Sequence, residues 1–377
     1  MLETKRSRTA AIAFAAIILA GACSSGATTT PTPTSTGPTT APTATPMPAG
    51  SVAINGAGAT FPYPLYSRWF YEYAFIDPSV KFNYQSIGSG GGIKQITART
   101  VDFGASDAIL NAAQFAAAPG IQMFPTVAGA EVVAYNISEL KDQAALVIDG
   151  ATLANIFLGK ITNWNDAAIA ALNPGVALPD KPIVVVHRSD GSGTTFIFTD
   201  FLSSVSPDWK ATVGNATSVQ WPVGLGGKGN EGVAGTLGQT DGSIGYVELA
   251  YAVTNKLAFA RMVNASGATV EAGIPGVQSA MADFGSDLPD TLARSIVNGT
   301  GAGSWPISGY TYLLLYMDQT DCTKAGKLVD FVKWALEADG SKFATDLQYA
   351  PLPDAVKAKV LTKIGAITCN GQALPAN

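Results

Sequence analysis

The stretch from residue 182 to residue 202 constrains this chain most, because it reads as strand, glycine-serine loop and helix. Residues 183–186 are a continuous β-branched run of strand length, typical of a strand covered on both faces. From Phe198 to Val205, apolar side chains recur at positions i, i+3, i+4 and i+7, the spacing of an amphipathic helix. The chain therefore contains at least one strand-loop-helix unit of the α/β kind.

The loop between this strand and helix carries groups that suit an anion. A helix that begins there presents free backbone N–H groups and the positive end of its dipole. Arg188 adds a guanidinium whose fork matches tetrahedral oxyanions, and Ser192 and Thr194 add hydroxyls. The loop therefore predicts a cradle for phosphate or sulfate. A serine-capped helix beside one surface arginine explains the same residues, and both interpretations stay open at this point.

Two earlier segments repeat the same pattern. A short strand at 52–55 is followed by a glycine-rich loop and by aromatic residues at helical spacing from Tyr66 to Tyr73. Alternating apolar residues at 80–84 are followed by the loop 88–92 and by a further helix start. Ligands of α/β sheets gather where strand ends meet helix starts. Three such loops predict a shared ligand site, whereas glycines that merely close turns are the alternative.

The first 23 residues have the pattern of an export signal. Basic residues precede the apolar run 10–20, which is too short to span a bilayer but typical of a signal-peptide core. The segment from Leu19 to Cys23 resembles a bacterial lipoprotein signal, in which the cysteine is lipidated and becomes the first mature residue. Ala20 departs from the usual leucine, and ordinary secretory cleavage is the alternative. We therefore expect Cys23 to carry palmitate and to anchor the protein on the outer face of the cytoplasmic membrane.

Residues 24–50 contain ten Thr and six Pro, with no charge and no aromatic ring. Such a segment cannot bury enough apolar surface to order its backbone, which predicts a disordered and fairly extended tether. The remaining residues, 51–377, are long enough for two domains with their own cores.

The charge balance of the chain argues against a strongly anionic macromolecular partner. The chain has 23 basic and 28 acidic side chains, and removing residues 1–23 takes away Lys5, Arg6, Arg8 and Glu3, leaving a net charge of −7. No global field would attract nucleic acid or an anionic membrane surface. Any bound anion must be held by local groups.

Cysteine usage agrees with export. Apart from Cys23, the chain has only Cys322 and Cys369, and His187 is its only histidine. A zinc site is therefore not expected. An exported pair favours a disulfide between Cys322 and Cys369, with two buried free thiols as the alternative.

Four motifs together resemble the phosphate-binding proteins of bacterial ABC importers. They are Asn55–Pro62 (NGAGATFP), Gly88–Ile96 (GSGGGIKQI), Val101–Asp107 (VDFGASD) and Arg188–Thr194 (RSDGSGT). Further matches are Leu158–Ile161 with Trp164, Asn173–Gly175, Trp221–Asn230 and Ile244–Glu248. The resemblance covers nearly all of 51–377 in family order. One departure is Gly90, where many members have a second serine, so that the loop would lack a hydroxyl there.

The resemblance implies an α/β fold of the two-lobe periplasmic-binding-protein type (type II), which closes on one phosphate in the interlobe cleft. Lobe one would comprise 51–129 plus 303–377, and lobe two would comprise 130–302. The implied phosphate contacts are Thr60, the Phe61 backbone N–H, Ser89 and Asp107 from lobe one, and Arg188, Ser192, Gly193 and Thr194 from lobe two. Asp190 would hold the Arg188 guanidinium. The implied protein is a monomer without cofactor, metal or enzymatic activity, and its partners are the permease and ATPase subunits of a phosphate importer.

Asp107 would be an acceptor among donors. At neutral pH an ordinary aspartate is ionised and only accepts hydrogen bonds. Phosphate can still donate a P–OH to it, whereas sulfate cannot. We therefore expect the protein to bind phosphate and largely ignore sulfate, through an unfavourable contact with the wrong ligand.

Three other functions are alternatives to phosphate import. A binding protein for another oxyanion is disfavoured by Asp107, and a phosphate-ester hydrolase lacks a metal cluster and any base beyond His187. A surface protein that signals phosphate status is a third alternative.

The glycine-rich run 224–235 lacks the Gly-Lys-Ser/Thr ending of a nucleotide loop, so we expect it to pack against the rest of the protein rather than to bind a nucleotide. Four of the six tryptophans are expected in the core: Trp69, Trp164, Trp221 and Trp305.

Overall fold

The computed structural model describes residues 51–141, 143, 145–285 and 287–375. The expected export signal, Cys23 and the tether lie outside the described residues. No helix in the described part of the chain is both long and apolar enough to cross a membrane.

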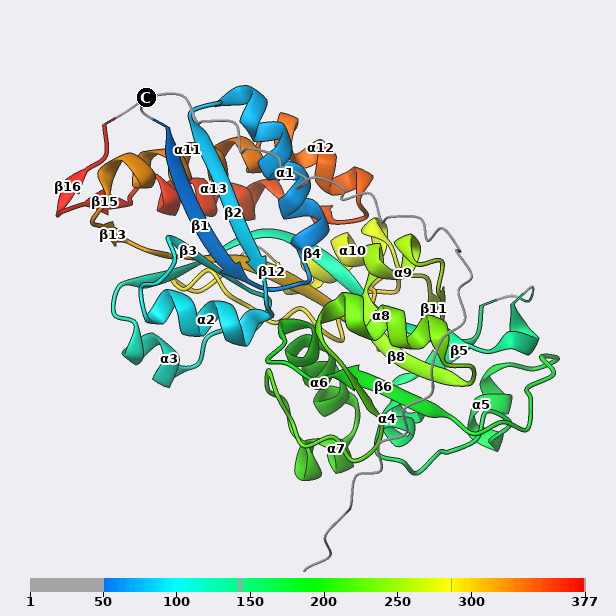
Figure 1. The fold of residues 1–377 in the computed structure, drawn as a ribbon. Coiled ribbons are helices and arrows are strands. Elements are labelled where there is room, and N and C mark those ends of the chain that lie inside the picture. Colours follow the sequence, from blue (N-terminus) through cyan, green and yellow to red (C-terminus); the bar gives the residue numbers. More distant parts are fainter. Residues whose placement is uncertain (1–50, 142, 144, 286, 376–377) are drawn as a thin grey trace, which may run out of the picture. The chain divides into compact units, whose positions relative to one another are not determined.

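The strands form two sheet regions that share one long strand, β4 (Figure 1). We call them the first sheet and the second sheet. The first sheet has the order β2 (Val80–Ser86), β1 (Val52–Gly58), β3 (Phe103–Ser106), β12 (Ser308–Tyr316) and β4 (Ile121–Asn136), with β14 (Ala350–Pro351) also on β4. The second sheet continues from β4 to β8 (Ser243–Glu248), β6 (Val184–Arg188) and β7 (Leu225–Gly227), with β9 (Ala258–Phe259) also on β4.

Two small sheets complete the strand set of the described residues. One joins β11 (Thr269–Val270), β10 (Arg261–Val263) and β5 (Val147–Asp149), and the other joins β13 (Asp318–Gln319), β15 (Thr368–Cys369) and β16 (Gln372–Ala373).

Helices cover both sheets. The helices that follow the early strands are α1 (Tyr63–Ile76), α2 (Ser89–Thr97), α3 (Ala112–Ala117), the 3-10 turn Ser138–Leu140, α4 (Gly150–Phe157) and α5 (Ala167–Leu172). The later ones are α6 (Gly193–Val205), α7 (Pro207–Thr212), α8 (Gly229–Gln239), α9 (Leu249–Thr254), α10 (Ile274–Phe284), α11 (Cys322–Leu336), α12 (Ala338–Asp346) and α13 (Asp354–Ile364). In Figure 1, α1 and α11 lie with the first sheet, whereas α6 and α8 lie with the second.

The parallel pairs explain why the predicted strand-loop-helix units occur where they do. β1 pairs in parallel with β2 and β3, and β6 pairs in parallel with β7 and β8. Parallel strands need crossover connections, and helices α1, α2 and α8 supply them. The carboxyl ends of these strands, with their glycine loops, therefore face the starts of the helices.

β4 is an almost fully buried strand that carries a bulge near its middle. Its first part pairs with β12, and Thr126 is an extra residue between the pairs Tyr312–Pro125 and Thr311–Val127. Proline cannot donate to a ladder, so pairing is interrupted beside Pro125. The bulge lies next to Thr311, whose hydroxyl reaches the functional cluster described below.

Aromatic packing holds each sheet to its helices. Beneath the first sheet, the Phe82 ring lies 4.7 Å from Phe70 and 4.5 Å from Phe331. On the second sheet, the Phe198 ring of α6 stacks 4.2 Å from Tyr246 of β8. Such pairs contribute about 0.5–1.5 kcal/mol beyond their buried area.

The tryptophan expectation is borne out for Trp69, Trp164 and Trp305, which are buried. Trp221 is partly exposed and stacks on the His187 ring at 4.7 Å.

The predicted disulfide is confirmed. Cys322, the first residue of α11, is bonded to Cys369 of β15, with Cα atoms 5.4 Å apart. The bond ties the C-terminal strands to a helix of the first sheet. In the chain-entropy view, closing a loop of this length stabilises the folded state by about 4 kcal/mol at most.

Candidate functional site

Three helix starts meet at one buried cluster. They belong to α2, which begins at Ser89, to α6, which begins at Gly193, and to α8, which begins at Gly229. The loop that ends in Thr60, just before α1, joins them, because the Thr60 hydroxyl accepts from Asn230 of α8. Helix starts carry partial positive charge and free N–H groups, so this convergence favours a negative group.

Arg188 is the cationic side chain of the cluster, and it is 3% exposed. Its Nε and Nη2 donate to Asp190 at 2.8 and 2.6 Å, a two-pronged ion pair, while Nη1 donates to Thr194 at 3.2 Å. Asp190 is itself fixed by the Gly229 backbone N–H at 3.0 Å. Burial opposes the charge on Asp190, but the ion pair with Arg188 holds the pKa of this carboxyl below its ordinary value. The guanidinium is therefore clamped in one orientation.

The interpretation of this loop as a serine-capped helix beside a surface arginine is right in one part. Ser192 does cap α6, because its hydroxyl accepts from the Thr195 backbone N–H at 3.0 Å. The surface arginine of that interpretation is wrong, since Arg188 is buried. Capping uses the Ser192 oxygen as an acceptor and leaves its hydrogen free to donate.

Asp107 faces this cluster from the end of β3. Its Oδ1 accepts from the Thr311 hydroxyl at 2.7 Å, and its Oδ2 lies 3.4 Å from the Ser89 hydroxyl. Burial raises the pKa of Asp107 to about 7, although Thr311, Arg188 and Ser89 all act in the opposite direction. The expectation of a fully ionised Asp107 at neutral pH therefore needs correction. The pKa is raised because burial in the folded protein removes the carboxyl from water.

Several backbone N–H groups of the clustered residues have no protein acceptor in the described part of the chain. Within the described part of the chain, no carbonyl or side chain accepts from the N–H groups of Phe61, Ser89, Gly193 and Thr194. The last three lie in the first turns of helices, where no carbonyl of the same helix can reach them. Buried N–H groups are nearly always paired, so these donors indicate a site built for an oxyanion.

Glycines permit the close approach of the segments. A Cβ on Gly193 would collide with the Asp107 carboxylate and the Ser89 hydroxyl. Gly90 donates to the Gly191 carbonyl at 2.9 Å, and a Cβ on Gly90 would come within 3.1 Å of the Gly191 Cα. At position 90 the chain therefore has a glycine-to-glycine contact where a serine side chain would crowd the loop.

The structure thus brings together every residue expected at the anion site: Thr60, Phe61, Ser89, Asp107, Arg188, Asp190, Ser192, Gly193 and Thr194.

Sequence reasoning missed two residues of the cluster. Asn230 donates to Thr60 and to Thr194 at 2.8 and 3.0 Å, although its glycine-rich run was expected only to pack. Thr311 binds Asp107 from a position 204 residues away. The sequence does contain a signal for Asn230, because this polar residue follows a glycine-rich loop at a helix start, as the residues of the other loops do.

Two further carboxyls lie buried beside the cluster. Glu131 of β4 and Glu248 of β8 are directly opposite in the ladder, and both are 0% exposed. Neither oxygen of Glu131 has a partner in the described residues, whereas Glu248 accepts from Tyr349 and from the Ala250 N–H. Burial raises the pKa of Glu248 to about 8 and that of Glu131 well above its ordinary value. Burial therefore favours the neutral form of both carboxyls.

The features that enzymes of phosphate esters use do not gather here. Partial burial lowers the pKa of His187, whose Nδ1 lies 3.0 Å from the Arg188 carbonyl. Within the described residues there is no group of three or more His, Cys, Asp or Glu side chains that could hold a metal.

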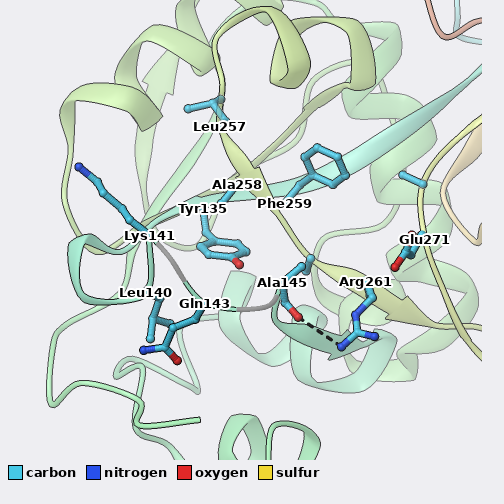
Figure 2. A pocket seen from close by; sticks show the side chains of 12 residues that line it. Tyr135, Leu140, Lys141, Gln143, Ala145, Leu257, Ala258, Phe259, Arg261 and Glu271 are labelled. Carbon is cyan, nitrogen blue, oxygen red and sulfur yellow. Dashed lines mark hydrogen bonds between the residues drawn. The ribbon is translucent and has the colours of Figure 1, made fainter.

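A separate cavity of about 370 Å³ lies elsewhere on the second sheet (Figure 2). Its lining includes Tyr135, Phe259 and Arg261, and Arg261 donates to the Ala145 carbonyl. None of its lining residues belongs to the cluster around Arg188.

Comparisons with known proteins agree with this geometry. The model of the PBP superfamily domain matches residues 27–339. The phosphate-binding protein PstS of Xylella fastidiosa (strain Temecula1) is 48% identical over 303 residues, which make up 80% of this chain and 82% of that protein. PstS of Haemophilus influenzae is 46% identical over 303 residues, or 80% of this chain and 89% of that protein.

A solved structure supports the fold. The phosphate-binding protein from Stenotrophomonas maltophilia has a TM-score of 0.63 at 21% identity and covers 86% of this chain and 100% of that one. The chain therefore has the mixed α/β periplasmic-binding-protein fold and belongs to the PstS family of phosphate-binding proteins.

Proposed function

We propose that this protein binds inorganic phosphate outside the cytoplasm and delivers it to the permease of an ABC phosphate importer. The observation that carries the proposal is the composition of the buried cluster. One arginine, which is paired with Asp190, lies with several hydroxyls, four unpaired N–H groups and the Asp107 carboxyl. This is a set of donors for bare oxygens with a single position suited to a protonated oxygen.

The phosphate contacts we propose are Thr60, the Phe61 N–H, Ser89, Asp107, Arg188, Ser192, Gly193 and Thr194, with Asp190 supporting Arg188. The first four come from 51–129 and the others from 130–302, which are the segments we assign to lobe one and lobe two, with 303–377 completing lobe one. The anion would be enclosed when the two lobes close.

Sulfate shares the tetrahedral shape but has no proton for Asp107 at neutral pH. An unpaired buried acceptor costs about 1–3 kcal/mol, and more when charged, so phosphate should be preferred wherever Asp107 is ionised, which is above about pH 7. A hydrolase would need a nucleophile with an activating base beside it, and Ser192 already accepts from the Thr195 N–H. We therefore favour binding without chemistry.

Calorimetric titration of the purified protein with phosphate, sulfate and a phosphate monoester tests the proposal. Phosphate should bind tightly, sulfate weakly, and the ester should not be cleaved. Arg188→Ala should weaken both anions, whereas Arg261→Ala, which changes a cationic side chain of the separate cavity, should leave them unchanged. Equal affinities for sulfate and phosphate in the wild type would overturn the assignment.

We also propose that the mature chain is lipid-anchored through Cys23 and tethered by residues 24–50. The support is the resemblance of Leu19–Cys23 to a lipoprotein signal, followed by an uncharged Thr/Pro-rich segment. Cells grown with a fatty-acid probe should label the wild type and not the Cys23→Ala variant. Equal labelling of both proteins would refute the anchor and leave phosphate binding untouched.

A further inference from the structure

The Asn230 side chain has only one possible orientation. The residue is fully buried in the first turn of α8, and its Oδ1 accepts from the Glu248 backbone N–H at 3.0 Å. A backbone N–H can only donate, so the oxygen must face Glu248 and the amide nitrogen must face the other way. The direction of both amide hydrogens is therefore determined by the second sheet.

Those two hydrogens reach two threonines that are far apart in sequence. Asn230 Nδ2 donates to Thr60 Oγ1 at 2.8 Å and to Thr194 Oγ1 at 3.0 Å. Thr60 precedes α1, which packs on the first sheet, and Thr194 lies in the first turn of α6, which packs on the second. One amide therefore bridges the two parts of the cluster.

Each of these hydroxyls also accepts a second hydrogen bond. Thr60 Oγ1 accepts from the Asn230 backbone N–H at 3.2 Å, and Thr194 Oγ1 accepts from Arg188 Nη1 at 3.2 Å. A hydroxyl oxygen has two lone pairs and one hydrogen. With both lone pairs used, the hydrogen of each threonine is left to donate, and no protein group in the described residues accepts it.

We propose that Asn230 is a positioning residue that makes Thr60 and Thr194 obligate donors to the bound anion. The inference rests on the proposed phosphate function and deepens it. An oxygen that faces Thr60 or Thr194 meets a donor and no acceptor, so the position that best accommodates the P–OH hydrogen of hydrogen phosphate is the side of Asp107. Asn230 thereby helps to orient the ligand without touching it.

Double-mutant cycles measured by phosphate titration test this role. Asn230→Ala should lower phosphate affinity about tenfold or more, because the hydroxyls are then free to turn away from the anion. In Thr60→Val or Thr194→Val backgrounds the same change should cost distinctly less, since one of the hydroxyls on which it acts is absent. Asn215→Ala, a change to an exposed amide that bonds to Asp200, should be neutral in every background.

Asn230→Asp supplies a second readout. It keeps the shape and the acceptor for Glu248, but an ionised carboxylate offers no hydrogen to the threonines and attracts their hydroxyls instead. Phosphate affinity should fall more than in Asn230→Ala and partly recover at lower pH, as the new carboxyl gains a proton. A role limited to packing predicts no such recovery.

Two outcomes are distinguishable. If the wild type does not bind phosphate, the proposed function fails. If it binds, but Asn230→Ala costs the same factor with and without the threonine hydroxyls, and Asn230→Asp shows no recovery at lower pH, then Asn230 acts only through the fold and this inference is wrong.

Discussion

Among single residues, Asp107 has the most direct consequence for selectivity. Its neighbours Thr311 and Ser89 donate to it, yet burial prevails and its pKa rises to about 7. Below that pH the carboxyl is mostly protonated and can donate to a bare oxygen. Above it, the carboxylate only accepts. The barrier to sulfate therefore depends on pH.

We predict that discrimination against sulfate is strong at pH 8 and weaker at pH 6, because a protonated Asp107 can donate to a sulfate oxygen. Asp107→Asn should narrow the gap between the two anions and remove most of its pH dependence, since an amide donates at every pH. Competition titrations at both pH values measure this. Asp208→Asn, a surface change, is the control, and a ratio of affinities independent of pH in the wild type would contradict the mechanism.

A second prediction at this scale concerns Gly193. A Cβ there would meet the Asp107 carboxylate and the Ser89 hydroxyl, so Gly193→Ala should keep the two sides of the cluster apart and reduce phosphate affinity by at least tenfold. Gly326→Ala is a matched control, because no atom within 4 Å of its Cβ would be disturbed in α11. That control should bind normally and be slightly more stable, by about 0.5–1 kcal/mol. Normal binding by Gly193→Ala would show that the contact can relax.

Among the elements, the paired strands β4 and β8 place two buried carboxyl groups opposite each other. Glu131 and Glu248 face each other without exposure, and their raised pKa values mean that the folded protein holds protons the unfolded chain would release. An unfolded glutamate titrates near 4.3. The stability that neutral Glu248 contributes is therefore fully present below about pH 4.3 and is lost as the pH rises through about 8, and the raised pKa of Glu131 acts in the same direction.

Glu131→Gln should consequently raise the unfolding temperature at pH 8 and change it little at pH 4.5, because the amide keeps the shape and cannot ionise. Thermal unfolding across this pH range provides the measurement. The exposed Glu337→Gln change should have no comparable pH dependence. A constant effect of Glu131→Gln at all pH values would mean that Glu131 does not carry the proton.

The sequence predicts the local elements of the fold, but it does not predict the contacts between distant segments. The strand-loop-helix units are legible because period-2 and period-3.6 patterns are local, and β1, α1, β6 and α6 occur where those patterns indicate. The cluster also follows, since parallel strands place their carboxyl ends together. Thr311 and Asn230 were missed because their roles arise from pairing and packing between distant segments. The pKa of Asp107 was missed because it depends on burial, which a motif does not report.

In the molecule as a whole, the cluster is assembled from both sides of β4. Gly90 and Gly191 are joined by a backbone hydrogen bond, and Asn230 reaches Thr60 across the same boundary. Since several of the proposed donors lie on each side, neither side can enclose an anion alone. The hydrogen bonds across the boundary are individually modest, about 0.5–1.5 kcal/mol each, so the two sides should separate when no anion links them.

We therefore predict that phosphate shifts the protein from an open to a closed state. Small-angle scattering should show a smaller radius of gyration with saturating phosphate than without it, and sulfate at the same concentration should have little effect at pH 8. Gly193→Ala should stay expanded with phosphate, because its methyl group occupies the space where Asp107 and Ser89 meet α6. Gly326→Ala should compact like the wild type. If calorimetry shows saturation while the radius of the wild type is unchanged, the anion enters a site that is already closed, and the N–H groups of Phe61, Ser89, Gly193 and Thr194 must be reached by another route.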